Sequence, residues 1–134
     1  MPVPVLPDSL ALAREALLAQ SSLTALVSTR IYERIPASPT WPLLVASIVD
    51  DLELEWHTGQ ARVQVDVWGA GSSPTQAAEA LNITRVVRAV ARDLRGSWTA
   101  GDVASAAPGI IIPAPDPDTG RARYLIDLLI QTNP

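Results

Sequence analysis

The stretch that decides the fold reads Leu44-Val-Ala-Ser-Ile-Val-Asp-Asp-Leu-Glu-Leu-Glu-Trp56, then His57-Thr-Gly-Gln60, then Ala61-Arg-Val-Gln-Val-Asp-Val-Trp-Gly69. Both arms alternate with a period of two, which in a strand places successive side chains on opposite faces. The residues predicted to share an apolar face are Leu44, Ala46, Ile48, Leu52, Leu54 and Trp56 in the first arm and Ala61, Val63, Val65 and Val67 in the second. The pattern predicts one long β-hairpin.

The two faces of this hairpin together predict one register. The predicted pairs are Trp56–Ala61, Glu55–Arg62, Leu54–Val63, Glu53–Gln64 and Leu52–Val65. A slip of one residue would lose the matches on both faces. The same register places Asp51 opposite Asp66, and because like charges in direct opposition are destabilising, it predicts either a bulge or a bound cation. Asp50, on the apolar face, also requires a partner or a place at the mouth of the sheet.

Length and composition limit the classes of function. The chain has 134 residues, 48% of them hydrophobic, which predicts a single domain over residues 1–134 with one core and a proline-spaced, extended lead-in over residues 1–8. No apolar run approaches the roughly 20 residues that span a bilayer, and no signal-peptide pattern is present, so we expect no membrane partner. The absence of cysteine excludes disulfides and thiolate metal sites, and a single histidine (His57) makes us expect neither a zinc site nor a serine–histidine triad. The net charge of −4 predicts no general binding to a phosphate backbone. We assign no catalytic, metal or cofactor-binding residue.

The other elements complete the predicted fold. Helices are predicted over residues 9–20, 23–27 and 74–95, and further strands over residues 30–35, 102–113 and 121–131. The long helix begins at Ser73-Pro74-Thr75-Gln76, which has the pattern of a capping box with proline at the first helical position. Its apolar stripe, which should lie on the sheet, is Ala80, Ile83, Val87, Val90 and Leu94. This order predicts an α+β fold, a mostly antiparallel sheet of four to five strands with helices packed on one face.

Two charged surfaces of opposite sign are predicted on different elements. The long helix carries an arginine stripe opposite its apolar face, and the first hairpin arm carries a carboxylate ladder on its outer face: Arg85, Arg88, Arg92 and Arg95, and Asp51, Glu53 and Glu55. The stripe is open to three interpretations, a solvated face, a protein contact or a nucleic-acid contact. The ladder converges on no catalytic geometry, which leaves a solvated or interface face or a weak cation site. We hypothesise that in a ring the stripe of one copy faces acidic residues of the next.

Two smaller features have structural interpretations. Gly69-Ala-Gly71 precedes a helix but lacks the third glycine and the Gly-Lys-Thr/Ser ending of phosphate-binding loops, so it predicts a strand-to-helix turn. The four tryptophans predict core or interface anchors: Trp41, Trp56, Trp68 and Trp98. Trp68, on the outer face of the hairpin, is the best interface candidate because tryptophan is enriched at interface hot spots.

Three segments carry a resemblance to a known family. Residues 17–32, with Leu23-Thr-Ala-Leu-Val27 and Arg30-Ile-Tyr32, resemble the opening of the small tail-terminator and tail-completion proteins of long-tailed bacteriophages. Residues 61–69 followed by an alanine-rich helix resemble the family's central strand and helix, and Arg123-Tyr-Leu-Ile-Asp127 resembles its final strand. The likeness covers residues 11–131 and rests on order and spacing, with Pro42-Leu43 as a departure where proline followed by an aromatic residue is expected.

The resemblance implies a structural, non-enzymatic virion protein. Such proteins form a ring, typically a hexamer, on the head-proximal end of the tail tube, end tube polymerisation and join the tail to the head connector. The implied partners are further copies of the chain, the tail tube protein and the connector or stopper protein, with genomic DNA only passing through the lumen. Assembly would take place in the host cytoplasm. An acidic lumen would suit DNA passage because like charges repel, which makes Asp51, Glu53 and Glu55 candidates for lining it. Alternatives are another neck protein, such as a head–tail stopper or minor tail protein, and a small ligand-binding α+β domain.

Overall fold

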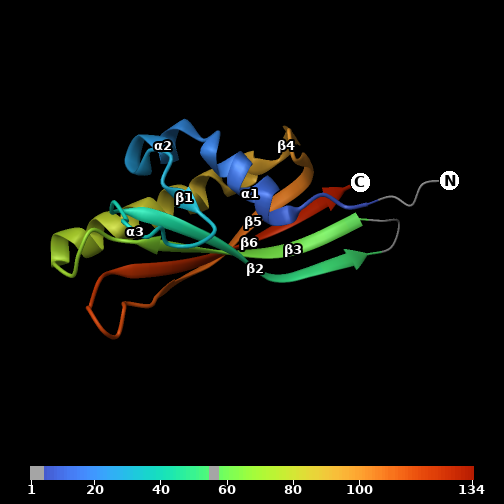
Figure 1. Ribbon diagram of the computed structural model, residues 1–134. Coiled ribbons are helices and arrows are strands. Elements are labelled where there is room, and N and C mark those ends of the chain that lie inside the picture. The colour runs from blue at the N-terminus through green and yellow to red at the C-terminus, as the bar shows by residue number, and fades with distance from the viewer. Residues whose placement is uncertain (1–4, 55–57) are drawn as a thin grey trace.

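The computed structural model describes residues 5–54 and 58–134. The elements in chain order are α1 (Ser9–Leu18), α2 (Ser21–Val27), β1 (Ile31–Tyr32), β2 (Leu43–Leu54), β3 (Thr58–Trp68), α3 (Pro74–Val90), the 3₁₀ helix η2 (Ala91–Leu94), β4 (Gly96–Trp98), β5 (Gly101–Pro113) and β6 (Arg123–Asn133). The strands of the described residues form one six-stranded sheet in the order β1-β2-β3-β6-β5-β4 (Figure 1). Every neighbouring pair is antiparallel except β1–β2, which is parallel.

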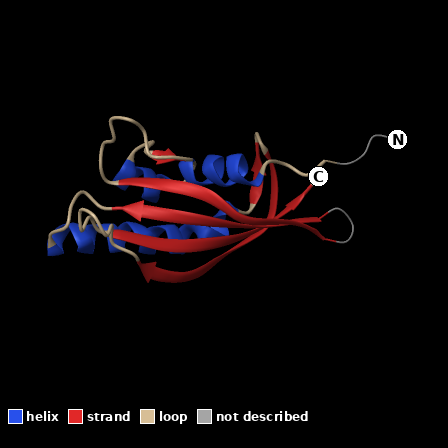
Figure 2. Cartoon of the chain, turned by 60° about the horizontal axis from the view of Figure 1, so that its bottom comes forward, coloured by secondary structure: helices blue, strands red, loops and turns tan. Residues whose placement is uncertain are grey.

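The helices form a layer on one face of this sheet. α1 contacts β2 and β3, and α3 contacts β6 and β3. Figure 2 shows the strands in front and the helices behind them, so the front face of the sheet is open. The predicted α+β class with helices on one face is confirmed. The sheet has six strands rather than four to five because the three-residue strand β4, which was not predicted, pairs with β5 at one edge; β1, at the other edge, is a two-residue part of the strand predicted over residues 30–35.

The helices begin where short polar side chains satisfy their first backbone N–H groups. The Asp8 carboxylate accepts hydrogen bonds from the backbone N–H groups of Leu10 and Ala11 at 3.0 and 3.1 Å, which starts α1. The capping box of α3 is confirmed, since Ser73 and Gln76 bond reciprocally at 3.2 Å. α2 begins at Ser21, two residues before the predicted start, and Gln20 takes the cap position without a side-chain hydrogen bond.

The apolar stripe predicted for the long helix is confirmed, although the helix changes form before its end. All five stripe residues are buried: Ala80, Ile83, Val87, Val90 and Leu94. The α-helix ends at Val90, and residues 91–94 continue as a tighter 3₁₀ turn rather than as α-helix to Arg95. Ile83, Val87 and Leu94 of the stripe pack with residues of α1, α2 and the sheet in one core cluster, which includes Leu12, Leu44 and Ile126. The sheet and all helices therefore share one hydrophobic core.

A carboxylate connects the helix layer to the far end of the sheet. Glu15 on α1 accepts hydrogen bonds from the backbone N–H groups of Ala100 and Thr99, at 2.8 and 2.6 Å, in the turn between β4 and β5. These two bonds stabilise the ionised form, so the pKa of the Glu15 carboxyl lies below its ordinary value. The bonded residues are separated by 84 and 85 positions in the chain, so this contact is long-range in sequence.

The predicted hairpin exists, but its predicted register is wrong. Leu52 pairs with Gln60 and Leu54 with Thr58, so the turn lies closer to the first arm than predicted. The predicted opposition of Asp51 and Asp66 does not occur, since Asp51 pairs with Ala61. A register shift between Ile48 and Asp50 leaves Val49 as an extra residue, which fits the predicted bulge. Glu55, Trp56 and His57, with the pairs predicted for them, lie outside the described residues.

The bulge at Val49 reverses the face of the sheet that is occupied by each β2 side chain after it. Before it, Leu44 and Ala46 are opposite the buried residues Val67 and Val65 and are fully buried, as predicted. After it, Leu52 and Leu54 pair with Gln60 and Thr58, residues of the open face, and are 51% and 39% exposed. Directly paired residues in antiparallel strands point to the same side of the sheet. The prediction that Leu52 and Leu54 share the apolar face of Leu44 is therefore wrong.

Candidate functional site

The predicted arginine stripe faces away from the core. We call Arg85, Arg88, Arg92 and Arg95 the arginine face; all four are exposed, on α3, on η2 and at the residue after η2. Within the described residues, no side-chain hydrogen bond or ion pair joins any of the four to another group. Four neighbouring cations repel one another unless an anion lies close to them. The surface is therefore suited to an acidic partner.

The carboxylates of β2 lie on the two sides of the sheet. Asp51 and Glu53 pair with Ala61 and Gly59, on the helix-bearing side, so the prediction that they lie on the outer face is wrong. The Val49 bulge is the physical reason, because one extra residue exchanges the faces of every residue that follows it. We call Asp51 and Glu53 the β2 carboxylates; both are exposed.

Asp50 has the partner that the sequence required of it, but on the open face. Its carboxylate lies 3.9 Å from Nε of Arg62, the residue with which it pairs across the hairpin. Both side chains are about half exposed, so this ion pair contributes little to stability. Its main effect on the surface is to neutralise one of the three described carboxylates near the hairpin tip.

The structure places Trp68 in a cluster that the sequence analysis did not predict. The rings of Trp41 and Trp68 lie 6.0 Å apart, the guanidinium of Arg121 lies 4.1 Å from the Trp41 ring centre, and that of Arg123 lies 4.7 Å from the Trp68 ring centre. Arg121 also donates to the carbonyl of Gly69 at 3.0 Å. These contacts tie the loop before β2 to β3 and β6, so Trp68 is half-buried by its own chain.

Asp66 borders this tryptophan–arginine cluster. Its carboxylate accepts a hydrogen bond from Gln64 at 2.8 Å and lies 4.0 Å from a guanidinium nitrogen of Arg123. Burial raises the pKa of the Asp66 carboxyl above its ordinary value, although Gln64 and Arg123 act in the opposite direction. The sequence signal for the cluster was the spacing of Arg121 and Arg123, which share a face of the final strand, but their aromatic partners are distant in the chain.

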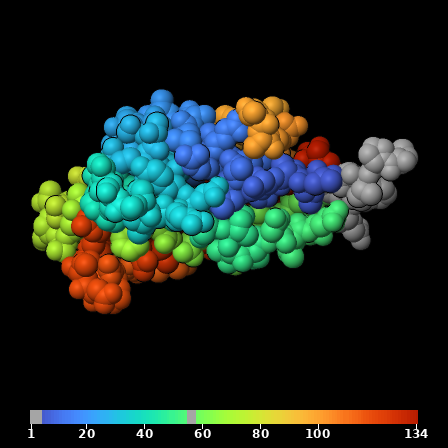
Figure 3. Space-filling view, in the orientation of Figure 1, coloured from blue at the N-terminus to red at the C-terminus, as the bar shows by residue number. Residues whose placement is uncertain are grey.

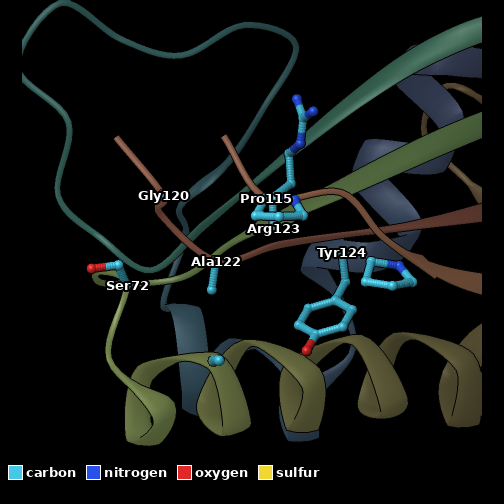
Figure 4. Close-up of a pocket in the computed structure, with 8 residues that line it drawn as sticks. Ser72, Pro115, Gly120, Ala122, Arg123 and Tyr124 are labelled. Carbon is cyan, nitrogen blue, oxygen red and sulfur yellow. The ribbon is translucent and has the colours of Figure 1, made fainter. Parts of the chain in front are cut away.

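A hollow of about 260 Å³ opens where β6 begins, close to α3 (Figure 4). Its lining includes Ser72, Pro113, Pro115, Ala122 and Tyr124, and Tyr124 points toward α3. Arg123 is the one charged residue in the lining, and its Nε donates to the carbonyl of Ala114 at 2.7 Å. The lining holds no carboxylate or histidine that would act as a base on Ser72. The hollow has the composition of a shallow contact surface rather than of a catalytic site.

Metal-binding side-chain groups and membrane-spanning helices are the last two features of the described residues. In residues 5–54 and 58–134, no group of three or more histidine, cysteine, aspartate or glutamate side chains is placed to hold a metal ion. None of the described helices is by itself long and apolar enough to cross a membrane; α1 and α2 together meet the length and composition criteria, but they are bent by 85° where they join.

Comparison with known proteins identifies the family. The chain resembles a protein in the solved structure described as the virion of a native gene transfer agent particle, with a TM-score of 0.63, 14% identity, and coverage of 89% of this chain and 90% of that chain. That likeness supports the fold. No curated protein matches the sequence. The family model described as tail completion protein gp17 matches residues 13–123. The chain therefore belongs to the tail completion protein gp17 family and is a structural protein of the phage tail and neck, located in the virion.

Proposed function

We propose that the protein forms a ring, a hexamer by family resemblance, on the head-proximal end of the phage tail tube. There it ends polymerisation of the tube and provides the surface that joins the tail to the head connector. Its partners are further copies of itself, the tail tube protein and the connector or stopper protein. The observation that carries the proposal is the family match over residues 13–123, in a chain that exposes the arginine face and the β2 carboxylates on different elements.

The arrangement of charge supports a ring. A head-to-tail contact requires two different surfaces that complement each other, and it closes into a ring when the rotation between copies allows it. The arginine face and the β2 carboxylates are such a pair, because they lie on different elements and neither Arg88 nor Arg92 has an ionic partner in the described residues. In this proposal the arginine face of each copy meets the β2 carboxylates of the next.

The same charge balance suits the passage of DNA. The chain has a net charge of −4, so a ring of copies is acidic overall. A DNA duplex moving through an acidic lumen is repelled by the wall rather than held by it. The β2 carboxylates that are not covered by the neighbouring copy would contribute to that wall. The DNA is conducted without being read.

Imaging of tails assembled without this protein tests the role. A terminator is the component that stops tube growth, so its absence gives tubes longer than those of the complete phage. A head–tail stopper acts later, and its absence gives tails of normal length that fail to attach to heads. Overlong tubes, restored to normal length when the protein is supplied, are the result that the proposal expects. Normal tubes that remain unattached would assign the stopper role instead.

A further inference from the structure

Each of the two edges of the sheet includes a long stretch of strand that has no neighbouring strand on its outer side. β1 pairs only with Leu44 and Val45 of β2, and no described strand pairs with the outer edge of residues 46–54. At the opposite side, β4 pairs with residues 101–103 of β5, and no described strand pairs with the outer edge of residues 104–113. Unpaired N–H and C=O groups along a strand edge are a template for another strand.

Large apolar side chains are exposed along the same two runs. In the described part of the chain, six of the ten exposed large hydrophobic residues lie on β2 or β5: Ile48, Val49, Leu52, Leu54, Ile110 and Ile112. Figure 3 shows the later part of β2, in green, on the surface of the molecule below α1. β2 carries two features that limit pairing at an edge strand, the bulge at Val49 and its acidic residues Asp50, Asp51 and Glu53, so its open edge favours a partner edge that carries cations. Such exposed strands are typical of edges that a partner covers.

The register of the sheet places opposite charges at its two edges, at the same position along the strand direction. We call residues in one such cross-strand row level with one another, or at the same height. The row of paired residues that starts at Glu53 continues through Gly59, Thr132, Val103 and Gly96. Arg95 directly precedes Gly96, so it lies at the height of Glu53 but at the opposite edge of the sheet. Asp51 and Glu53 are on the helix-bearing side, which is also the side of η2 and its Arg92.

The open runs of the two edges are matched in the same way. The row that starts at Ala46, where the open run of β2 begins, continues through Val65 and Ile126 to Ile111 of β5. The row of Ser47 passes through Gln64 to Asp127, beside the irregular segment of β5 between Pro108 and Ile111. The open edge of β2 is thus level with the open edge of β5. The acidic end of β2 is level with β4 and Arg95.

We propose that β2 of one copy pairs antiparallel with β5 of the next copy, so that the sheet continues from subunit to subunit. β2 and β5 run in opposite directions because three antiparallel pairings separate them. A head-to-tail rotation that brings these two edges together therefore pairs them antiparallel and at matching positions along the strands. Asp51 and Glu53 of one copy then approach Arg92 and Arg95 of the next. This inference rests on the proposed ring and specifies its contact.

Charge selects β5 of a second copy as the occupant, rather than another β2. Two β2 edges in contact would bring Asp50, Asp51 and Glu53 of both copies together, and like charges in direct opposition are destabilising. The side of the molecule that carries β5 also carries arginines. Pro108 and Pro113 each remove one N–H donor from β5, so pairing uses residues 104–107 and 109–112.

Disulfide trapping tests the proposed contact directly, because the chain contains no cysteine. A variant with both Ser47→Cys and Ile110→Cys places one thiol on each edge at matching heights. Under mild oxidation in solution, the proposal expects a ladder of covalent oligomers on a non-reducing gel, ending at the closed ring. Either cysteine alone cannot give species larger than a dimer. The matched control, Ser47→Cys with Leu26→Cys, moves the second thiol to an exposed position on α2 and should give no ladder.

A second variant measures the same contact without oxidation. Val49→Lys adds a charge to the β2 edge and should lower the assembled fraction at a given concentration at least tenfold, whereas Leu26→Lys should leave it unchanged. Thermal unfolding of both variants checks that each remains folded. A double-cysteine variant that cross-links no better than its control, with Val49→Lys assembling normally, would overturn the edge contact. If tails lacking the protein are nevertheless overlong, the terminator role stands while the edge contact is rejected. If tails lacking the protein have normal length but the double-cysteine variant gives a ladder, the edge contact stands and the terminator role is rejected.

Discussion

The two halves of the β2–β3 hairpin have similar apolar patterns and different surroundings. In the half before the Val49 bulge, Leu44 and Ala46 are fully buried beneath the helix layer. In the half after it, Leu52 and Leu54 are exposed on the open face. The end of β2 extends past α1 in Figure 1. The first half belongs to the monomer's own core, and the second presents a strand edge and carboxylates to whatever lies beside the molecule. The alternating pattern therefore continues past the end of the monomer's own core.

Truncating one leucine in each half gives the largest expected contrast. Leu44→Ala removes a fully buried side chain from the core and should lower the free energy of unfolding by about 2–5 kcal/mol. Leu52→Ala, at a 51% exposed position of the same strand, should change it by about 0.5 kcal/mol or less. Denaturant unfolding of the two variants, under conditions where both are monomeric, measures the difference. Equal losses of stability would mean that the second half is also part of the monomer's core.

Reversing charge on the arginine face tests the surface that is proposed to receive the second half of the hairpin. Arg88→Glu with Arg92→Glu replaces attraction by repulsion toward the β2 carboxylates and should abolish assembly without unfolding the monomer, because both residues are exposed and unpaired within the described residues. Size-exclusion chromatography and thermal unfolding give the two readouts. Arg34→Glu, an exposed arginine outside the arginine face, is the control and should assemble normally. Normal assembly of the double variant would show that the pairing is wrong.

Deleting Val49 sharpens the comparison by removing the bulge between the two halves. Residues 50–54 would keep their partners on β3, so Leu52 and Leu54 would stay on the open face and the β2 carboxylates on the helix-bearing side. We expect a folded monomer that assembles like the parent chain, because the carboxylates still lie on the side of Arg92 and Arg95. Mass measurement over a concentration series tests this, and weaker assembly of a folded variant would mean that the bulge itself is needed at the contact.

The smallest expected effect concerns the anchoring of the helix layer. Hydrogen bonds from the N–H groups of Ala100 and Thr99 lower the pKa of the Glu15 carboxyl in the folded state. A lowered pKa means that this group's contribution is complete above its unfolded value near 4.5 and is lost as the pH falls through its folded value. Glu15→Gln should therefore be less stable than the parent chain at neutral pH, with the gap closing on acidification. A gap that does not depend on pH would contradict this assignment.

The sequence was sufficient for those features that local chemistry determines. The capping box at Ser73 and the buried stripe of α3 follow from residues within a few positions of one another, and both predictions hold. The hairpin register does not follow in this way. The prediction aligned Leu54 with Val63 as though both were buried by one core, whereas Leu54 follows a bulge in its strand and is exposed on the open face of the sheet. Periodicity carries no information about whether a neighbouring molecule or the same chain supplies the cover.

The candidate surfaces were predicted to a similar extent. The arginine face could be derived from helical spacing alone, because an exposed face of a helix depends only on where its buried stripe lies. The side of the sheet occupied by Asp51 and Glu53 depended on one inserted residue and was wrong. The cluster of Trp41, Trp68 and Arg121 depends on contacts between segments far apart in the chain, which no local pattern reports.

An image of the assembled tail at a resolution that traces strands would test the central claim most directly. The account predicts a closed ring of this protein at the head-proximal end of the tube, with the open edge of β2 in each copy beside β5 of the next and the arginine face covered. A ring in which both strand edges and Arg85, Arg88 and Arg92 face only solvent, or a single copy bound elsewhere on the particle, would contradict it.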